Sequence, residues 1–144
     1  MENISLKLVE NQDWKTALKL LEKHQLPTAD IGANVALYGV FQGSSLIGTM
    51  GLEAHNTEGL LRSVCLDSGF QNKGLGTIIL KKIEEKIAQQ GIQKIYLLTT
   101  TAKAFFEKNQ YTVISRADVS DALKQTTEFT STCPSSAIVM LKYL

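Results

Sequence analysis

The sequence predicts an α/β fold, in which helices cover a mixed β-sheet, and three observations lead to this prediction. Stretches with the alternation and β-branched residues of strands stand on both sides of a long stretch with the apolar period of a helix. Two early strands are separated by a short turn at residues 43–45, which indicates an antiparallel hairpin. The long helix joins two further strands, and such a crossover places them parallel in a right-handed unit.

Composition predicts one domain, residues 1–144. The 144 residues are 44% hydrophobic and 20% charged and contain two prolines, which is typical of a domain with a sizeable core. A formal charge of +1 gives no overall field that would attract nucleic acid or an anionic membrane. No apolar run approaches the ~18 residues of a membrane span, and no leader segment is visible. We therefore expect a cytoplasmic protein with reduced cysteines, without a metal, nucleic-acid or membrane partner.

The first half of the chain predicts one helix and four strands. A strand over residues 4–9 precedes a helix that runs to about Lys23, with Asn11 or Asp13 as its N-cap. Residues 35–41 and 46–54 form the hairpin. Residues 58–66 add a third strand to this antiparallel group.

The second half begins with an amphipathic helix that ends at Gly91. Its apolar stripe is predicted to be Leu75, Ile78, Ile79, Ile83 and Ile87, while its charged residues, Glu84 among them, occupy the outer face. A buried strand over 94–100, a short helix over 102–108 and a strand over 111–114 follow. A polar, partly helical insertion over 118–129 then precedes the closing strand over 136–143.

The start of the long helix has the residues expected of a pyrophosphate-binding turn. A first helical turn has up to four unpaired N–H groups and a partial positive charge, and Gly74 and Gly76 leave the approach to them open. Gln71, Asn72 and Lys73 add side-chain donors. The alternative is that the glycines only permit a tight turn. Neither a dinucleotide-binding fingerprint nor a P-loop fits, because the required third glycine and the GK[ST] triplet are absent.

Two sequence blocks resemble the GCN5-related N-acetyltransferases, or GNAT family. The acetyl-CoA motif Q/R-x-x-G-x-G/A is matched by Gln71, Asn72, Lys73, Gly74, Leu75 and Gly76. A second block is matched by Ala102, Phe105, Phe106, Glu107, Lys108 and Tyr111. The segments 59–64, 96–111 and 128–140 further resemble acetyltransferases encoded in arsenic-resistance operons and, more distantly, amino-acid N-acetyltransferases of the acetylglutamate-synthase type.

The resemblance implies a single-domain GNAT fold whose mostly antiparallel sheet, with helices on both faces, is splayed between the strands at 58–66 and 94–100. It implies acetyl-CoA as the acetyl donor, with its pantetheine arm paired along the first of these strands. The residues that the resemblance assigns to acetyl-CoA are Val64, Cys65, Leu66, Gln71, Asn72, Lys73, Gly74, Leu75, Gly76, Thr77, Thr99, Ala102 and Phe105.

Acetyl transfer to an amine needs a base, and Glu53 is the best candidate, acting directly or through water. Its alternative role is an exposed carboxylate at a strand end; His55 and Glu58 are second choices. Many relatives have a tyrosine as general acid where Phe106 stands here. The hydroxyl of Tyr111 is a candidate substitute, with core packing as the alternative.

Arg62 alternates with Leu60 and Val64 on one face of a strand that should be mostly buried, so it needs an anionic partner. This partner is either an internal carboxylate or the carboxylate of a substrate, which the resemblance favours. Thr100 and Thr101, together with Glu53, complete the expected acceptor pocket.

These residues predict an acetyl-CoA-dependent N-acetyltransferase that acts by direct attack of a small, amino-acid-like amine. The alternative is a catalytically silent module that binds or senses acyl-CoA. Cys133 is expected to be a packed thiol, since direct transfer needs no cysteine nucleophile. A homodimer is left open.

Overall fold

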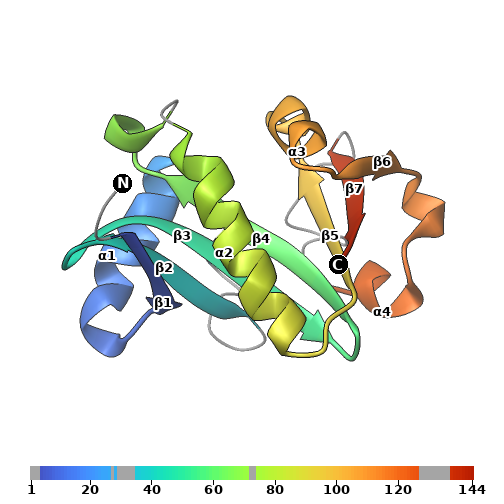
Figure 1. The fold of residues 1–144 in the computed structure, drawn as a ribbon, viewed down its shortest axis with the longest axis horizontal. Coiled ribbons are helices and arrows are strands. Elements are labelled where there is room, and N and C mark those ends of the chain that lie inside the picture. Colours follow the sequence, from blue (N-terminus) through green and yellow to red (C-terminus); the bar gives the residue numbers. More distant parts are fainter. Residues whose placement is uncertain (1–3, 27, 29–34, 72–73, 127–136) are drawn as a thin grey trace.

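The computed structural model describes residues 4–26, 28, 35–71, 74–126 and 137–144. In this part of the chain, seven strands form one mixed, mostly antiparallel sheet of order β1-β2-β3-β4-β5-β7-β6, with helices against it (Figure 1). The strands are β1 (Ile4–Leu8), β2 (Ala36–Gln42), β3 (Ser45–His55), β4 (Glu58–Leu66), β5 (Lys94–Thr99), β6 (Thr112–Ile114) and β7 (Ile138–Tyr143). The helices are α1 (Asn11–Lys23), α2 (Leu75–Gln89), α3 (Lys103–Lys108) and α4 (Asp121–Lys124), with 3-10 turns η1 (Ser68–Phe70) and η2 (Arg116–Asp118). The predicted α/β class is confirmed.

Strands β2, β3 and β4 form the predicted antiparallel group, and β1 adds to it by pairing antiparallel with β2. Gly43 lies in the hairpin turn at φ 60°, where a residue without a Cβ is favoured. The predicted N-cap of α1 is wrong, because Glu10 occupies that position. The N–H of Asp13 already bonds the carbonyl of Glu10 at 2.9 Å, so Asn11 and Asp13 lie inside the first turn.

Helix α2 ends before Gly91, which adopts φ 87° as predicted for a helix stop. The predicted apolar stripe is correct except at Ile78, which is 38% exposed. Glu84, expected on the outer face, is instead buried. The buried face is therefore rotated toward Leu80 and Glu84, which follow each other by one helical turn.

The last part of the chain adds the other edge of the sheet. Strand β7 pairs antiparallel with both β5 and β6. The predicted insertion, residues 118–129, contains helix α4 in its described portion, and η2 ends at its first residue. Residues 127–136, which include Cys133 and the expected start of the closing strand, lie outside the described residues.

The sheet separates between β4 and β5, the two parallel strands. They pair only from Glu58 to Leu61 on β4 and from Lys94 to Leu97 on β5. Beyond this point β4 continues along β3 and β5 continues along β7, so the two strands diverge toward the top of Figure 1. The splayed sheet is thus confirmed, and the start of α2 and the short helix α3 both lie at its open end.

Three hydrophobic clusters lie on the two faces of the sheet. The α2 face contains Leu61, Leu97 and the apolar stripe of α2. The other face carries a cluster at α1 and a second cluster in which Leu60 and Tyr96 contact Leu123 of α4. Neighbouring residues Leu60 and Leu61 therefore point to opposite faces, as the pleat requires.

Candidate functional site

A β-bulge bends β4 where that strand leaves β5. The register between β3 and β4 shifts between Thr49 and Gly51, and Ser63 adopts φ 53°, a left-handed conformation that is uncommon without glycine. The Thr49 hydroxyl donates to the carbonyl oxygen of Ser63 at 2.8 Å, and both residues are buried. The extra residue also changes the faces beyond it. Val64 packs on the α2 face, opposite to Leu60, so the prediction that Arg62, Leu60 and Val64 share one face is wrong.

The bulge leaves one backbone edge of β4 next to the divergence. Val64, Cys65 and Leu66 lie on β4 beyond the last pair with β5, while their other edge faces β3. All three side chains are half-buried. Burial raises the pKa of the Cys65 thiol, which therefore stays protonated at neutral pH. What this segment offers to a ligand is extended backbone rather than a reactive side chain.

The turn from β4 to α2 is described up to Gln71 and again from Gly74. Gln71 Nε2 donates to the carbonyl oxygen of Leu66 at 2.7 Å. Gly74 is the N-cap of α2 at φ 74°, and a Cβ on Gly74 would meet nothing within 4 Å. No side chain of the described residues caps the first turn. Thr77 in this turn is half-buried. Asn72 and Lys73, predicted to add donors here, lie outside the described residues.

Gly76 brings the start of α2 against α3. A Cβ on Gly76 would lie 3.2 Å from the Phe105 ring. Phe105 is half-buried and packs edge-on against Phe106, with ring centroids 5.1 Å apart. At the end of β5, the Thr99 hydroxyl accepts a hydrogen bond from the Ala102 N–H at 2.9 Å and so fixes the start of α3. Gly76 of the first sequence block and Phe105 of the second therefore meet at the open end of the sheet.

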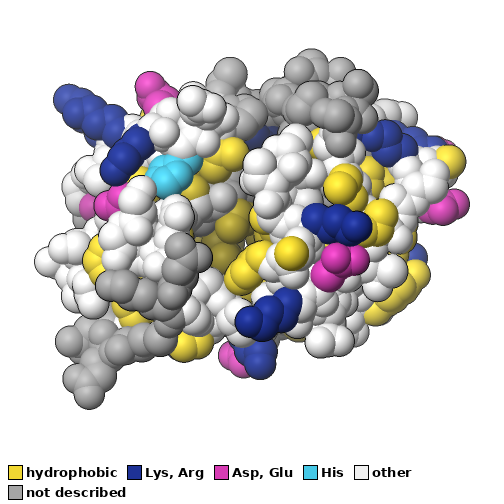
Figure 2. Space-filling view, turned by 90° about the horizontal axis from the view of Figure 1, so that it is seen from above, with side chains coloured by type: hydrophobic (Ala, Val, Ile, Leu, Met, Phe, Trp, Pro, Cys, Tyr) yellow, Lys and Arg dark blue, Asp and Glu magenta, His cyan; other side chains and the backbone are white. Residues whose placement is uncertain are grey.

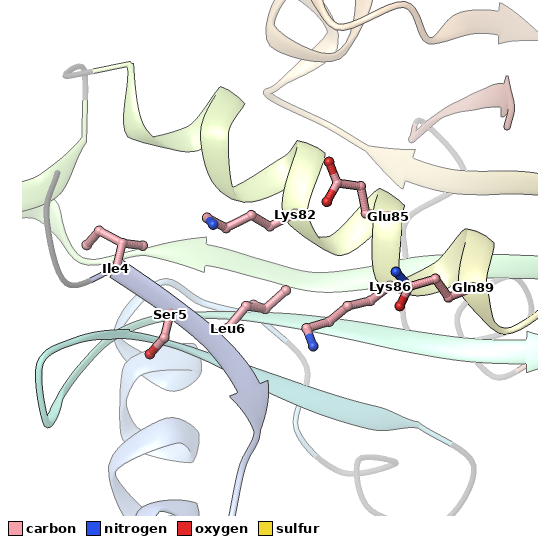
Figure 3. A pocket seen from close by; sticks show the side chains of 7 residues that line it. All are labelled: Ile4, Ser5, Leu6, Lys82, Glu85, Lys86 and Gln89. Atoms are coloured by element: carbon pink, nitrogen blue, oxygen red, sulfur yellow. The ribbon is translucent and has the colours of Figure 1, made fainter.

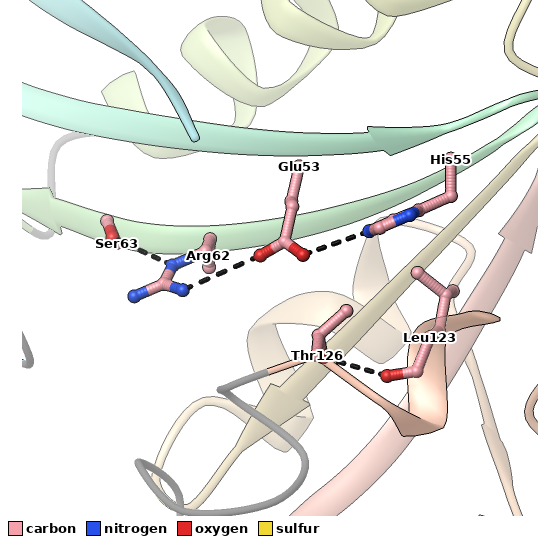
Figure 4. Close-up of polar contacts among 6 residues, drawn as sticks. All are labelled: Glu53, His55, Arg62, Ser63, Leu123 and Thr126. Atoms are coloured by element: carbon pink, nitrogen blue, oxygen red, sulfur yellow. Dashed lines mark hydrogen bonds and ion pairs between the residues drawn. The ribbon is translucent and has the colours of Figure 1, made fainter. Parts of the chain in front are cut away.

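Glu53 belongs to a buried charged cluster on the face opposite α2 (Figure 4). Its Oε2 lies 2.9 Å from His55 Nε2, and its Oε1 lies 3.8 Å from Arg62 Nη1. Arg62 Nε also donates to the Ser63 hydroxyl at 3.4 Å. The side chains of Glu53 and Arg62 are 8% and 1% exposed, so the alternative of an exposed strand-end carboxylate is wrong. An internal partner for Arg62, the other alternative, is present.

The Glu53 cluster lies beside the point of divergence. Glu53 pairs with Leu60 across the strands, and Arg62 follows directly after the last β4–β5 pair at Leu61. Thr100 and Thr101, the other predicted acceptor residues, are exposed in the turn after β5. Seen from above, the molecule has a hollow with hydrophobic side chains at its base (Figure 2).

Tyr111 lies in a different environment, in a buried network with α2 and β7. Its hydroxyl donates to Glu84 Oε2 at 2.8 Å, and Lys142 Nζ donates to Glu84 Oε1 at 2.9 Å. Burial, reinforced by the Glu84 carboxylate, raises the pKa of Tyr111 far above its ordinary value. These contacts favour packing over proton donation for Tyr111. The helical pattern of the sequence did not single out Glu84 or Lys142, since it placed Glu84 on the outer face of α2.

A groove of about 350 Å³ lies between β1 and α2 (Figure 3). It is lined by Ile4, Ser5, Leu6, Lys82, Glu85, Lys86 and Gln89. It contains none of the predicted site residues. Among the described residues, no group of three or more His, Cys, Asp and Glu side chains could hold a metal ion. The described helices are all too short or too polar to cross a membrane.

Comparison with known proteins connects this geometry to a family. A sequence model described as the acetyltransferase (GNAT) family matches residues 7–111. Two Bacillus subtilis (strain 168) proteins, both described as uncharacterized, YxbD and YdhI, are each 42% identical over 52 residues. Each match covers 33% of this chain and about a third of the relative, 33% and 32% respectively.

Solved structures share the fold at low sequence identity. N-acetylglutamate synthase from Neisseria gonorrhoeae, complexed with coenzyme A and N-acetyl-glutamate, superposes with a TM-score of 0.81 at 14% identity, over 98% of this chain and 35% of that one. A GNAT acetyltransferase from Staphylococcus aureus Mu50 gives 0.75 at 18% identity, over 98% and 99% of the two chains. PaiA N-acetyltransferase from Thermoplasma acidophilum, in complex with coenzyme A, gives 0.72 at 15% identity, over 98% and 99%.

Proposed function

We propose that this chain, which belongs to the acetyltransferase (GNAT) family, transfers the acetyl group of acetyl-CoA to the amine of a small, amino-acid-like acceptor. The observation that carries the proposal is the edge of β4 that does not pair with β5 beyond Leu61, beside the first turn of α2, which no side chain of the described residues caps. An extended edge can pair with an amide-containing arm, and a bare helix start can bind a diphosphate. Both features lie at the open end of the splayed sheet.

The described residues fit acetyl-CoA. Backbone groups of Val64, Cys65 and Leu66 would pair with the pantetheine arm. The open space at Gly74 and the backbone N–H groups up to Thr77 would hold the pyrophosphate, with Asn72 and Lys73 as further donors. Thr99, Ala102 and Phe105 would form the opposite wall, with Thr99 acting through the turn that it fixes.

When bound, acetyl-CoA supplies an activated thioester, and the chain must supply the proton acceptor. We assign this role to Glu53. Freeing an α-amine of pKa ~8 from its proton at pH 7 costs about 1.4 kcal/mol, whereas a lysine-type amine of pKa ~10.4 costs about 4.6 kcal/mol. A carboxylate held in a buried cluster can accept this proton directly or through water.

In the transfer, the amine nitrogen bonds to the acetyl carbon, the carbon–sulfur bond breaks, and the sulfur leaves with its electron pair. One proton of the original ammonium goes to Glu53, and the proton lost after attack neutralises the leaving sulfur. A thiol of pKa ~8.5 can leave without a dedicated acid. We therefore assign Tyr111 to packing and propose that Phe106 does not prevent the reaction.

For the acceptor, we propose an amine that also carries an acidic group. Arg62 would bind this group bidentately if its present pair with Glu53 opens, with Thr100 and Thr101 at the rim. A carboxylated product accompanies coenzyme A in the N. gonorrhoeae synthase, which supports this class. The resemblance to arsenic-resistance acetyltransferases adds arsenic- and phosphorus-containing amino-acid analogues to the candidates.

Two measurements test the proposal. Calorimetry with acetyl-CoA should detect binding, and a thiol reagent should detect coenzyme A release that depends on one or more amines from a panel of amino acids and their analogues. Gly74→Val should weaken acetyl-CoA binding, because a branched side chain at φ 74° distorts the turn and fills the open space. Gly43→Val, also at positive φ but in a distant hairpin, is the matched control.

The outcomes separate the two functions. Binding without amine-dependent release across the panel favours the silent acyl-CoA module, for which Phe106 in place of tyrosine is the supporting observation. Equal binding by Gly74→Val and the unmodified protein contradicts the proposed pyrophosphate turn.

A further inference from the structure

The imidazole of His55 connects the buried Glu53 carboxylate to solvent. His55 Nε2 lies 2.9 Å from Glu53 Oε2, which is hydrogen-bond distance. The His55 side chain is 29% exposed, whereas that of Glu53 is 8% exposed. Figure 4 shows Glu53 between Arg62 and His55, with the imidazole on the side away from Arg62. One oxygen of the Glu53 carboxylate therefore faces Arg62, where β4 and β5 diverge. The other oxygen contacts the imidazole of His55, which is partly exposed to solvent.

A buried base in this position needs an exit for the proton that it accepts. Water reaches Glu53 poorly, and Arg62, the other charged group on it, carries only donors and cannot take a proton. Imidazole has a donor and an acceptor nitrogen and exchanges protons readily near neutral pH. Among the contacts that the described residues make with Glu53, His55 is the one suited to proton transfer.

The charges around His55 are compatible with this use. Glu58 lies directly opposite His55 on β4, and its Oε2 accepts a hydrogen bond from the Tyr96 hydroxyl at 3.3 Å. Lys94 of β5 lies beside Glu58 in the register of the two strands. The charged groups near His55 are thus the carboxylates of Glu53 and Glu58 together with Lys94 and Arg62.

We propose that His55 is a positioning residue that orients Glu53 and passes its proton to solvent during acetyl transfer. The inference rests on the proposed function. The proton leaves the acceptor ammonium for a Glu53 oxygen, crosses the hydrogen bond from Oε2 to Nε2, and a proton leaves the imidazole to water or buffer. Glu53 is then ionised again, and the imidazole, now protonated on Nε2 instead of Nδ1, regains its starting orientation of donor and acceptor by a ring flip, so the cycle needs no further reactant.

Two replacements separate orientation from proton transfer. His55→Gln retains a polar side chain that can hold Glu53 but cannot pass a proton, whereas His55→Ala removes both functions and leaves space for added imidazole. We expect each to lower kcat by about 10- to 100-fold, less than the loss in Glu53→Gln, with KM for acetyl-CoA unchanged. Added imidazole should raise the kcat of His55→Ala several-fold. The chain's other histidine supplies the control, His24→Gln, which should keep the kcat of the unmodified protein.

Each result decides the proposal. A normal kcat in His55→Gln overturns proton transfer by His55 and leaves the proposed acetyltransferase intact. A lower kcat without imidazole rescue in His55→Ala, accompanied by a higher KM for acetyl-CoA, assigns His55 a merely structural role and also overturns it. If the unmodified protein releases no coenzyme A with any amine, both proposals fail together.

Discussion

Glu53 and Glu84, the two buried glutamates among the described residues, have different surroundings and therefore different uses. Both oxygens of Glu84 are engaged at short distance, by Tyr111 at 2.8 Å and by Lys142 at 2.9 Å. Glu53 has one short contact, with His55, and one long contact of 3.8 Å with Arg62. A carboxylate with all its partners in place stabilises a fold, whereas one with a loose partner beside an open strand edge can take part in chemistry.

Replacing Tyr111 with Phe tests whether the hydrogen-bonded Glu84 stabilises the fold. The change keeps the ring and its edge-on contact with Phe106 but removes the hydroxyl that Glu84 accepts. A buried charge that loses a hydrogen bond destabilises the protein by about 1–3 kcal/mol. Urea unfolding at pH 7 measures this loss, with Tyr143→Phe on the exposed surface as control. A kcat that falls by 100-fold or more without loss of stability would instead restore Tyr111 as the proton donor.

For single residues, the sequence predicted that a charged side chain requires a partner, but it did not predict which residue that partner is. Arg62 in an apolar strand indicated an anionic partner, and the structure supplies Glu53, two residues from the end of the neighbouring strand. Glu84 could not be recognised as buried, because a helical period assigns faces only to within about one residue. The predicted and observed faces of α2 differ because Leu80 is also buried and extends the buried side of the helix toward Tyr111.

At the scale of elements, the bulge in β4 creates the site. It leaves Arg62 on the face of Glu53 while Val64 turns to the face of α2. Ser63 at φ 53° is held by the Thr49 hydroxyl rather than by a glycine. Strain kept in place by a buried hydrogen bond is typical of functional sites.

Thr49→Val should weaken this arrangement. Valine has nearly the shape of threonine but leaves the buried Ser63 carbonyl without its side-chain donor, which costs about 1–3 kcal/mol. If the bulge positions the β4 edge for acetyl-CoA, KM for acetyl-CoA should rise together with the loss in stability. Thr112→Val, on the exposed face of edge strand β6, is the matched control. Reduced stability with unchanged acetyl-CoA affinity would show that the bulge is not part of the binding site.

The bulge could not be predicted from the sequence, and the reason is physical. Residues 58–66 read as an ordinary strand, since strand alternation carries no mark of an inserted residue without a glycine. The hairpin, the parallel crossover and the stop at Gly91 could be predicted, because turn residues and connection rules determine them locally.

For the whole molecule, the order of elements could be predicted, whereas the meeting of distant residues could not. The contact between Gly76 and Phe105 and the network of Glu84 with Lys142 join segments far apart in the chain. Only the family resemblance placed the two sequence blocks at one site. The surroundings of Glu53 depend on two neighbours, His55 and Arg62, that the alternation of β3 and β4 brings together, and a pattern within one strand does not contain that information.

The same long-range packing makes the stability of the molecule sensitive to alkali. Burial and the neighbouring Glu58 raise the pKa of Tyr96 to about 12, and burial raises that of Tyr111 further. Unfolded tyrosines ionise near pH 10, so above that pH the unfolded chain releases protons that the folded protein keeps. The free energy of unfolding should therefore fall as pH rises above about 10, with a contribution of up to ~1.4 kcal/mol per pH unit from each buried tyrosine. Urea unfolding between pH 8 and 11.5 measures the slope, which should be shallower in Tyr111→Phe and unchanged in Tyr143→Phe. An equal slope in all three proteins would mean that Tyr111 ionises as easily in the folded state as in the unfolded chain, contrary to its contact with Glu84.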